Sequence, residues 1–190
     1  MPRAVVSRTE CRTGHPADFA QPKGQAVSRR VEVGPSPRVY GVCIHDGAVL
    51  LVRAANPHDG GEIWWLPGGG IDWGESPQQT LEREFIEETG LGVTNHLLHS
   101  VLDDQRVRVN GDHVHTVRII YLATVEVAPL QHESGGTTDF VMWAKLSELD
   151  QIRLADYAQS SIEAVVNMLA STETNELKSS LAPFRAAANL

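Results

Sequence analysis

Residues 67–91 of this 190-residue chain read PGGGIDWGESPQQTLEREFIEETGL. The proline and three glycines at the start favour a break in regular structure. Signals for the start of a helix follow: Ser76 is an N-cap residue, Pro77 suits the first helical position, and Gln79 completes a capping box. The stretch therefore predicts a glycine-rich turn that leads into a well-capped helix.

The helix is expected to span 77–89, because Gly90 is typical of the residue that follows a last helical turn. At about 100° per residue, one side of this helix gathers residues that are expected to be buried, namely Gln78, Leu81, Phe85 and Thr89. The adjoining arc carries a row of three acids: Glu84, Glu87 and Glu88.

This acidic row lies in a strongly negative region, since residues 59–88 contain eight acidic side chains and only Arg83 as a base. Like charges three and four residues apart destabilise an isolated helix. A hard divalent cation reverses that effect, and Mg²⁺ in particular binds to a few carboxylates together with substrate phosphates. A bound ion would also attract polyphosphates and could activate a water molecule. The alternative for charges at this spacing is a solvated helix face.

The rest of the chain alternates between extended and helical patterns. Asp46-Gly47 and Asn110-Gly111 are two-residue hairpin turns between apolar runs. The further expected elements are strands at 38–45, 48–53, 93–109, 113–125 and 140–143, and a second helix at 156–169. Together they predict a single α+β domain in which a mixed sheet lies between helices.

Charge and composition limit the kinds of partner that the chain is expected to bind. Residues 1–38 carry a net charge of +4, whereas residues 39–190 carry −12, so broad binding to nucleic acid is disfavoured. Apolar stretches are too short to span a membrane, and two isolated cysteines suit the reducing cytoplasm. We expect a disordered basic extension at 1–36 and a C-terminal tail at 171–190.

The pattern Gly69-x5-Glu75-x7-Arg83-Glu84-Phe85-x-Glu87-Glu88-x-Gly90-Leu91 resembles the Nudix box, G-x5-E-x7-R-E-U-x-E-E-x-G-U, at every defined position. The resemblance covers about residues 37–170. It implies a Nudix-type α/β/α sandwich with a mixed central sheet. It also implies hydrolysis of a nucleoside diphosphate linked to another group, with Mg²⁺ as the cofactor or Mn²⁺ as a substitute.

Carried over position by position, the resemblance implies a set of metal ligands: the Glu84, Glu87 and Glu88 carboxylates and the Gly68 carbonyl. It implies that Arg83 holds Glu75 in an ion pair that orients the helix. We nominate Glu84 as the general base, although some members of the family recruit a base from outside the box. Outside the box, the candidates are Glu133 and Asp139.

The substrate is less well defined than the reaction. Elimination favours a nucleoside triphosphate or a related small nucleotide, with ADP-ribose or a nucleotide sugar as alternatives. Each of Arg106, Arg108 and Arg118 could contact a phosphate or be a solvated surface residue. A non-catalytic nucleotide-sensing or interaction module on the same fold is the alternative function, and a homodimer is compatible with the resemblance.

Overall fold

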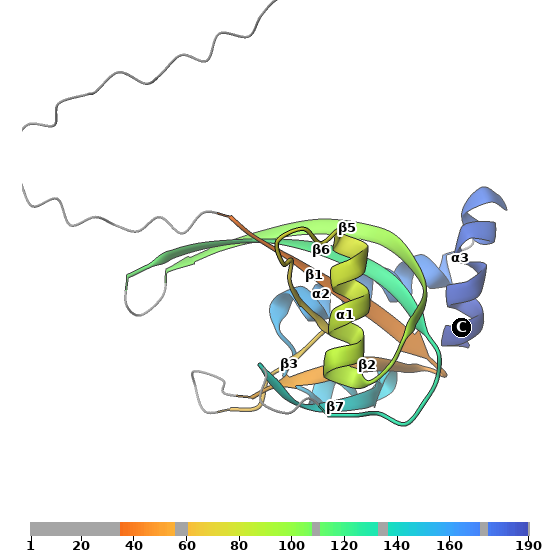
Figure 1. Ribbon diagram of the computed structural model, residues 1–190. Coiled ribbons are helices and arrows are strands. Elements are labelled where there is room, and N and C mark those ends of the chain that lie inside the picture. The colour runs from red at the N-terminus through yellow and green to blue at the C-terminus, as the bar shows by residue number, and fades with distance from the viewer. Residues whose placement is uncertain (1–34, 56–60, 108–110, 133–136, 172–174, 190) are drawn as a thin grey trace, which may run out of the picture. The chain divides into compact units, whose positions relative to one another are not determined.

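The computed structural model (Figure 1) describes residues 35–189 apart from 56–60, 108–110, 133–136 and 172–174. The expected N-terminal extension therefore falls outside the described residues, except for its last two. In chain order the elements are β1 (Ser36–His45), β2 (Ala48–Ala54), β3 (Trp64–Trp65), β4 (Gly68–Gly70), α1 (Pro77–Thr89), β5 (Val93–Val107), β6 (His113–Val125), β7 (Thr138–Lys145), the 3-10 helix η1 (Leu146–Gln151), α2 (Asp156–Ala170) and α3 (Asn175–Ala188).

The strands form a mixed seven-stranded sheet, as predicted. Its central order is β3-β2-β1-β6-β5, with β4 paired to β1 and β7 paired to β2. β1 and β6 are parallel, and the other paired strands are antiparallel. The turn between β1 and β2 has positive φ angles of 45° at Asp46 and 70° at Gly47, which agrees with the predicted Asp-Gly hairpin.

Helices cover both faces of the sheet, which confirms the predicted α/β/α sandwich. Side chains alternate along β1, so that Tyr40 and Val42 join the core under α2 and α3, whereas Val39 and Cys43 join the core under α1. Figure 1 shows α1 on the near side of the sheet and α2 on the far side. Within the described part of the chain, no helix is long and apolar enough to cross a membrane.

Helix α1 has the predicted bounds and the predicted caps. The Gln79 amide donates to the Ser76 hydroxyl at 3.3 Å, and the Ser76 amide donates to the Gln79 side chain at 2.9 Å. At the other end, Gly90 is left-handed with φ of 75°, and its amide donates to the Ile86 carbonyl. These local bonds satisfy backbone groups that a helix end otherwise leaves unpaired.

The buried face of α1 differs from the predicted one at three positions, one of which is Thr80, which is fully buried. Gln78 is exposed, and Glu88 is buried rather than part of an outer acidic row. The packing of Phe85 accounts for this orientation, since its ring fills the space above Gly41, where a Cβ atom would lie only 2.6 Å from the ring. With Phe85 at the centre of the contact, the next turn brings Glu88 inward and leaves Gln78 in solvent.

The glycine run forms a strand rather than the expected break. Gly68–Gly70 pairs with β1, and its residues lie opposite Tyr40, Val39 and Arg38. The approach requires glycine at Gly68, where φ is 139° and a Cβ atom would lie 2.1 Å from the Val39 carbonyl oxygen. This pairing fixes the glycine-rich segment at the edge of the sheet, beside α1.

The expected C-terminal tail is a third correction, because α3 is part of the core. Leu181, Phe184 and Ala188 are buried at helical spacing among the residues that cover the α2 side of the sheet. The turn between β1 and β2 also holds the end of α3, since the Asp46 and Gly47 amides donate to carbonyls of its last turn at 2.9 and 3.1 Å. Long-range burial and hydrogen bonding, rather than local signals, therefore stabilise this helix.

Leu181→Ala is expected to lower the free energy of unfolding by about 2–5 kcal/mol, because it removes a fully buried side chain from the core. Ser180→Ala, at an exposed position of the same helix, is the matched control and should change it by less than about 0.5 kcal/mol. Urea denaturation followed by circular dichroism measures both. Equal stability of the two variants would mean that α3 does not contribute to the core.

Candidate active site

Arg83 connects the start of α1 to the loop before it. Its Nε donates to Glu75 Oε1 at 2.8 Å and its Nη2 to Glu75 Oε2 at 3.0 Å, which makes a bidentate pair. The Thr80 hydroxyl donates to the same carboxylate at 2.7 Å. The bonds from Arg83, followed by the bond from Thr80, lower the pKa of Glu75 to about 2. This pair is the one that the resemblance implied.

The same guanidinium also gathers two further carboxylates of α1. Arg83 Nη1 donates to Glu84 Oε1 at 2.9 Å and to Glu87 Oε2 at 3.1 Å. Its Nη2 donates to the Gly70 carbonyl at 3.1 Å, which ties the network to β4. Since one nitrogen contacts both carboxylates, oxygens of Glu84 and Glu87 are directed to a common point.

Glu88 is held from the other side of the glycine strand. Its side chain is 3% exposed, and its Oε2 accepts a hydrogen bond from the Gly68 amide at 2.8 Å. A buried carboxylate is costly without a compensating partner, and a hydrogen bond to the charged form provides part of that compensation. β4 therefore positions Glu88 through a backbone hydrogen bond, which could not be predicted from the side chains of the motif.

Gly69 leaves the space in which the Glu84 carboxylate lies. A Cβ atom at Gly69 would be 2.2 Å from Glu84 Oε1, whereas a Cβ atom at the next residue, Gly70, would meet nothing within 4 Å. Glu84 is also mostly shielded from solvent, and burial raises the pKa of its carboxyl in spite of the opposing bond from Arg83. The conformation of Glu84 thus depends on the absence of a side chain on β4.

Gly69→Ala is expected to lower kcat/KM by about 10–100-fold. The added methyl group would push the Glu84 carboxylate out of position, and small displacements of a reacting group slow catalysis strongly. Gly70→Ala is the matched control, with open space around the added methyl group, and is expected to retain most of the activity. Steady-state kinetics on the substrate found by the screen described below measures both variants. A Gly69→Ala enzyme with the activity of Gly70→Ala would contradict this role for Glu84.

A pH dependence follows from the Glu75–Arg83 pair. Because the pKa of Glu75 falls from its ordinary value of 4.5 to about 2 on folding, its ionised form stabilises the folded chain above about pH 4.5. That contribution is lost as the pH falls through about 2. We therefore expect the stability difference between the wild type and Glu75→Gln to be constant near pH 7 and to shrink between pH values of about 4.5 and 2.

Urea denaturation of both proteins at a series of pH values measures this difference. Glu82→Gln, on the exposed side of α1, controls for the general effect of removing an acidic side chain. A difference for Glu75→Gln that does not change with pH would show that the pair does not form.

The donor set suits a hard divalent cation. The guanidinium of Arg83 donates to three carboxylates, those of Glu75, Glu84 and Glu87, and the Glu88 carboxylate is held nearby on β4 by the Gly68 amide, so the cluster is short of positive charge. Oxygen donors of this kind are the ligands that Mg²⁺ prefers. In the described ranges, no three acidic, His or Cys side chains are close enough to hold an ion as they stand. An ion would therefore replace Arg83 Nη1 as the partner of Glu84 and Glu87.

Of the two candidate bases outside the motif, the structure describes only Asp139. Asp139 lies on β7, where its Oδ1 accepts a hydrogen bond from Arg53 Nε of the neighbouring strand β2 at 2.8 Å, so it pairs with a cation rather than with the acidic cluster. Glu133 lies outside the described residues. Glu84 is thus the candidate base that lies within the cluster.

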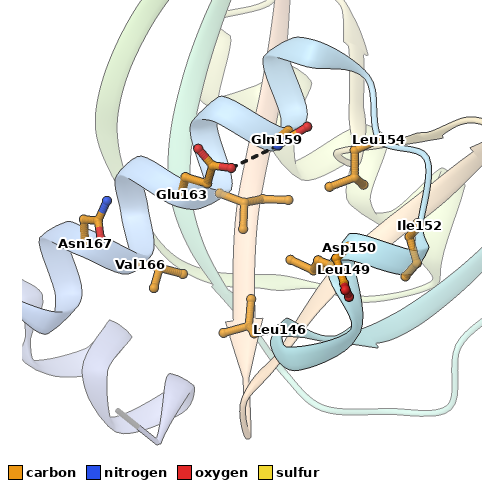
Figure 2. Close-up of a pocket in the computed structure, with 10 residues that line it drawn as sticks. Leu146, Leu149, Asp150, Ile152, Leu154, Gln159, Glu163, Val166 and Asn167 are labelled. Atoms are coloured by element: carbon orange, nitrogen blue, oxygen red, sulfur yellow. Dashed lines mark hydrogen bonds between the residues drawn. The ribbon is translucent and has the colours of Figure 1, made fainter.

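A separate groove of about 530 Å³ lies between η1 and α2 (Figure 2). Leu146, Leu149 and Val166 contribute to its apolar lining, and the Gln159 amide donates to Glu163 on its rim at 3.1 Å. No residue of the acidic cluster lines this groove. This groove is therefore distinct from the charged site.

The sequence left open whether Arg118 is a phosphate contact or a solvated surface residue. It is 7% exposed on β6, next to Arg38 of β1, whereas Arg106 is exposed and Arg108 lies outside the described residues. Arg38 and Tyr157 near it were not identified from the sequence. Strand alternation on β1 and β6 was the available signal, because it places Arg38, Tyr40 and Arg118 on one face of the sheet.

A family model described as NUDIX domain matches residues 35–165. Among solved structures, the chain is similar to a MutT NUDIX hydrolase from Burkholderia pseudomallei, with 27% identity, a TM-score of 0.59, and coverage of 69% of this chain and 98% of that chain. It is also similar to the NUDIX domain of Shewanella oneidensis NrtR complexed with ADP ribose. That match has 25% identity, a TM-score of 0.62, and coverage of 76% of this chain and 95% of the other.

Similarity to curated proteins is confined to a shorter segment. An RNA pyrophosphohydrolase from Photorhabdus laumondii is 45% identical over 51 residues, which are 27% of this chain and 27% of that protein. A second RNA pyrophosphohydrolase, from Aeromonas hydrophila, is 42% identical over 50 residues, or 26% of each chain. The chain thus matches about a quarter of the length of these relatives.

Proposed function

Because the chain belongs to the Nudix family, we propose that it is a divalent-metal-dependent hydrolase that cleaves a phosphoanhydride bond in a nucleotide. One observation carries this proposal: Glu84 and Glu87 are directed to a single nitrogen of Arg83, and Glu88 is fixed beside them by the Gly68 amide. A solvated helix face would not bury one of these carboxylates or hold it on a neighbouring strand.

The metal would be held by Glu84, Glu87 and Glu88 together with the Gly68 carbonyl. When bound, a divalent ion neutralises phosphate charge and lowers the pKa of a coordinated water. Arg83 and Glu75 position the start of α1, and β4 positions Glu84 and Glu88. Electrostatic preorganisation of this kind is the main contribution that a protein makes to phosphoryl transfer.

Glu84 is the proposed general base. In that role its carboxylate takes a proton from the attacking water while the water oxygen forms a bond to phosphorus. The bridging P–O bond breaks, and the leaving phosphate or nucleotide departs with the bonding electron pair. The proton then passes from Glu84 to solvent.

The proposed substrate is a nucleoside triphosphate or a related molecule with a 5′-triphosphate. Two relatives named RNA pyrophosphohydrolase support a triphosphate-bearing substrate. The similarity to a NUDIX domain complexed with ADP ribose supports the alternative, a diphosphate capped by a second group. A non-catalytic nucleotide-binding module is the other alternative on this fold.

A substrate screen with Mg²⁺ separates these possibilities. Nucleoside triphosphates, a short 5′-triphosphorylated RNA, ADP-ribose and nucleotide sugars are incubated with the protein, and the products are separated by ion-exchange chromatography. Release of pyrophosphate or phosphate without added phosphatase indicates a triphosphate substrate. Release of phosphate only after phosphatase is added indicates a capped diphosphate. Binding of nucleotides without any product in the presence of Mg²⁺ or Mn²⁺ would overturn the enzymatic proposal.

A further inference from the structure

Two arginines lie side by side on the sheet face that is covered by α2. Arg38 of β1 and Arg118 of β6 are register partners in the parallel pair of strands. Arg118 is buried, and its Nη1 is 3.0 Å from Asp104 Oδ1 on β5. Arg38 has no ion pair among the described residues, and its Nε donates to the Tyr40 hydroxyl at 2.8 Å. The pair of strands therefore carries two positive charges, and β5 supplies one compensating carboxylate.

Tyr157 of α2 closes over this pair. The guanidinium carbon of Arg118 is 4.5 Å from the centre of the Tyr157 ring, and the Tyr40 and Tyr157 rings are 4.8 Å apart. The stacking holds the planar guanidinium in one orientation, which a lysine could not reproduce. Arg118 is thus fixed between a carboxylate on one side and an aromatic ring on the other.

Two donors of this assembly have no hydrogen-bond partner among the described residues. They are Arg118 Nε and the Tyr157 hydroxyl, both of which are buried; one acceptor beside them, Asp104 Oδ1, also lacks a hydrogen bond within the described part of the chain, although it forms the ion pair with Arg118 Nη1. Burial raises the pKa of Tyr157 well above its ordinary value, so the hydroxyl keeps its proton. Buried donors are normally paired in folded proteins, and two unpaired donors in one place indicate a ligand that accepts hydrogen bonds.

The assembly adjoins the acidic cluster. Arg38 and Tyr40 lie opposite Gly70 and Gly68 in the pairing of β1 with β4. The charge of Arg38 lowers the pKa of Glu84, and the charge of Glu88 raises the pKa of Tyr157. Each effect is smaller than the effect of burial on the same group. A ligand could therefore contact both regions at once.

We propose that Arg38, Arg118 and the Tyr157 hydroxyl form an anion subsite that binds a phosphate group of the substrate, on the side of the metal-binding glutamates that faces β1 and α2. The two arginines outnumber Asp104, the carboxylate paired with Arg118, so the assembly itself carries a positive charge, although it adjoins the acidic cluster. The assignment as a substrate subsite rests on the proposed function, whereas the binding of an oxyanion does not.

The phosphate could belong to the end of a polyphosphate chain or to the nucleoside side of the molecule. Inorganic tripolyphosphate and adenosine monophosphate are the probes that separate these two sources. Isothermal titration calorimetry on the full chain in EDTA measures their binding without any contribution from metal. Binding of either probe at the subsite supports the proposal and identifies the source of the phosphate.

Arg118→Gln and Arg38→Gln are each expected to weaken binding of the preferred probe by about tenfold or more, because each removes a charged donor. Tyr157→Phe removes one neutral hydroxyl and leaves the stacked ring, so we expect a loss of about threefold to tenfold. Arg106→Gln is the matched control, since it removes the same charge from an exposed position on β5, and it should stay within about twofold of the wild type.

Thermal melting shows which variants are folded. If Arg118→Gln does not fold, Arg38→Gln and Tyr157→Phe decide the question. Folded Arg38→Gln and Tyr157→Phe proteins that bind both probes as tightly as Arg106→Gln would overturn the subsite, as would a wild type that binds neither probe. Glu88→Gln should retain binding in EDTA, so loss of hydrolysis without loss of binding separates failure at the metal site from failure at this subsite.

Discussion

Glu88→Gln is expected to lower kcat/KM by about 100-fold or more with Mg²⁺. Loss of a group that only orients a metal ligand typically costs about 10–100-fold, and Glu88 is proposed as a ligand itself. The change keeps the size of the side chain and an oxygen that can accept from the Gly68 amide, so the fold should persist. What is removed is the negative charge that the metal requires.

Steady-state kinetics at saturating Mg²⁺ measures this effect, and thermal melting checks the fold. Glu82→Gln is the matched control, because it removes the same charge from the exposed side of the same helix. We expect the control to retain nearly full activity. If Glu88→Gln were as active as Glu82→Gln, Glu88 would not be a metal ligand, and its hydrogen bond to Gly68 would be purely structural.

Phe85→Ala is expected to cause the largest loss of stability, about 3–5 kcal/mol in the free energy of unfolding. The ring is fully buried in the core between α1 and the sheet, and it occupies the space that Gly41 leaves open. Because the sheet cannot collapse into that space without moving β1, the substitution should leave a cavity.

Ile86→Ala is the control for this prediction. Ile86 is the next residue of the helix, but its side chain is 58% exposed, so its loss should change stability by less than about 0.5–1 kcal/mol. Chemical denaturation measures both variants. Equal losses would mean that α1 is not attached to the sheet through the Phe85 side, and the positions inferred for the glutamates would then be wrong.

Helix α1 could be predicted to the residue because its signals are local. Ser76, Gln79 and Gly90 determine the two ends through bonds that span only a few residues, and the structure contains those bonds. The hairpin between β1 and β2 was predictable for the same reason, since Asp46 and Gly47 adopt positive φ angles without help from the rest of the fold.

β4 and α3 could not be predicted in the same way, because both depend on distant partners. Gly68–Gly70 is a strand only because β1 lies beside it, and α3 is stabilised by burial of Leu181 and by bonds from the β1–β2 turn. Leu181, Phe184 and Ala188 lie at helical spacing, but we predicted a tail over 171–190, because spacing alone does not show which surface covers such residues.

The candidate site likewise has one part that local sequence signals predict and another that depends on distant residues. The motif predicted which acids bind the metal, and the structure adds how two of them are positioned: Glu84 by the space at Gly69, and Glu88 by the Gly68 amide. The second region, with Arg118 and Tyr157, brings residues from β6 and α2 together across the fold. No spacing in the sequence links them, so only the three-dimensional arrangement could indicate that assembly.

The direct test of the metal site is an anomalous difference map from crystals grown with Mn²⁺, collected above the manganese absorption edge. We expect anomalous peaks in contact with carboxylate oxygens of Glu84, Glu87 and Glu88, with Arg83 Nη1 displaced from Glu84 and Glu87 and the Glu75–Arg83 pair intact. A map in which manganese is absent from these three side chains, while Arg83 still bridges Glu84 and Glu87, would contradict the account.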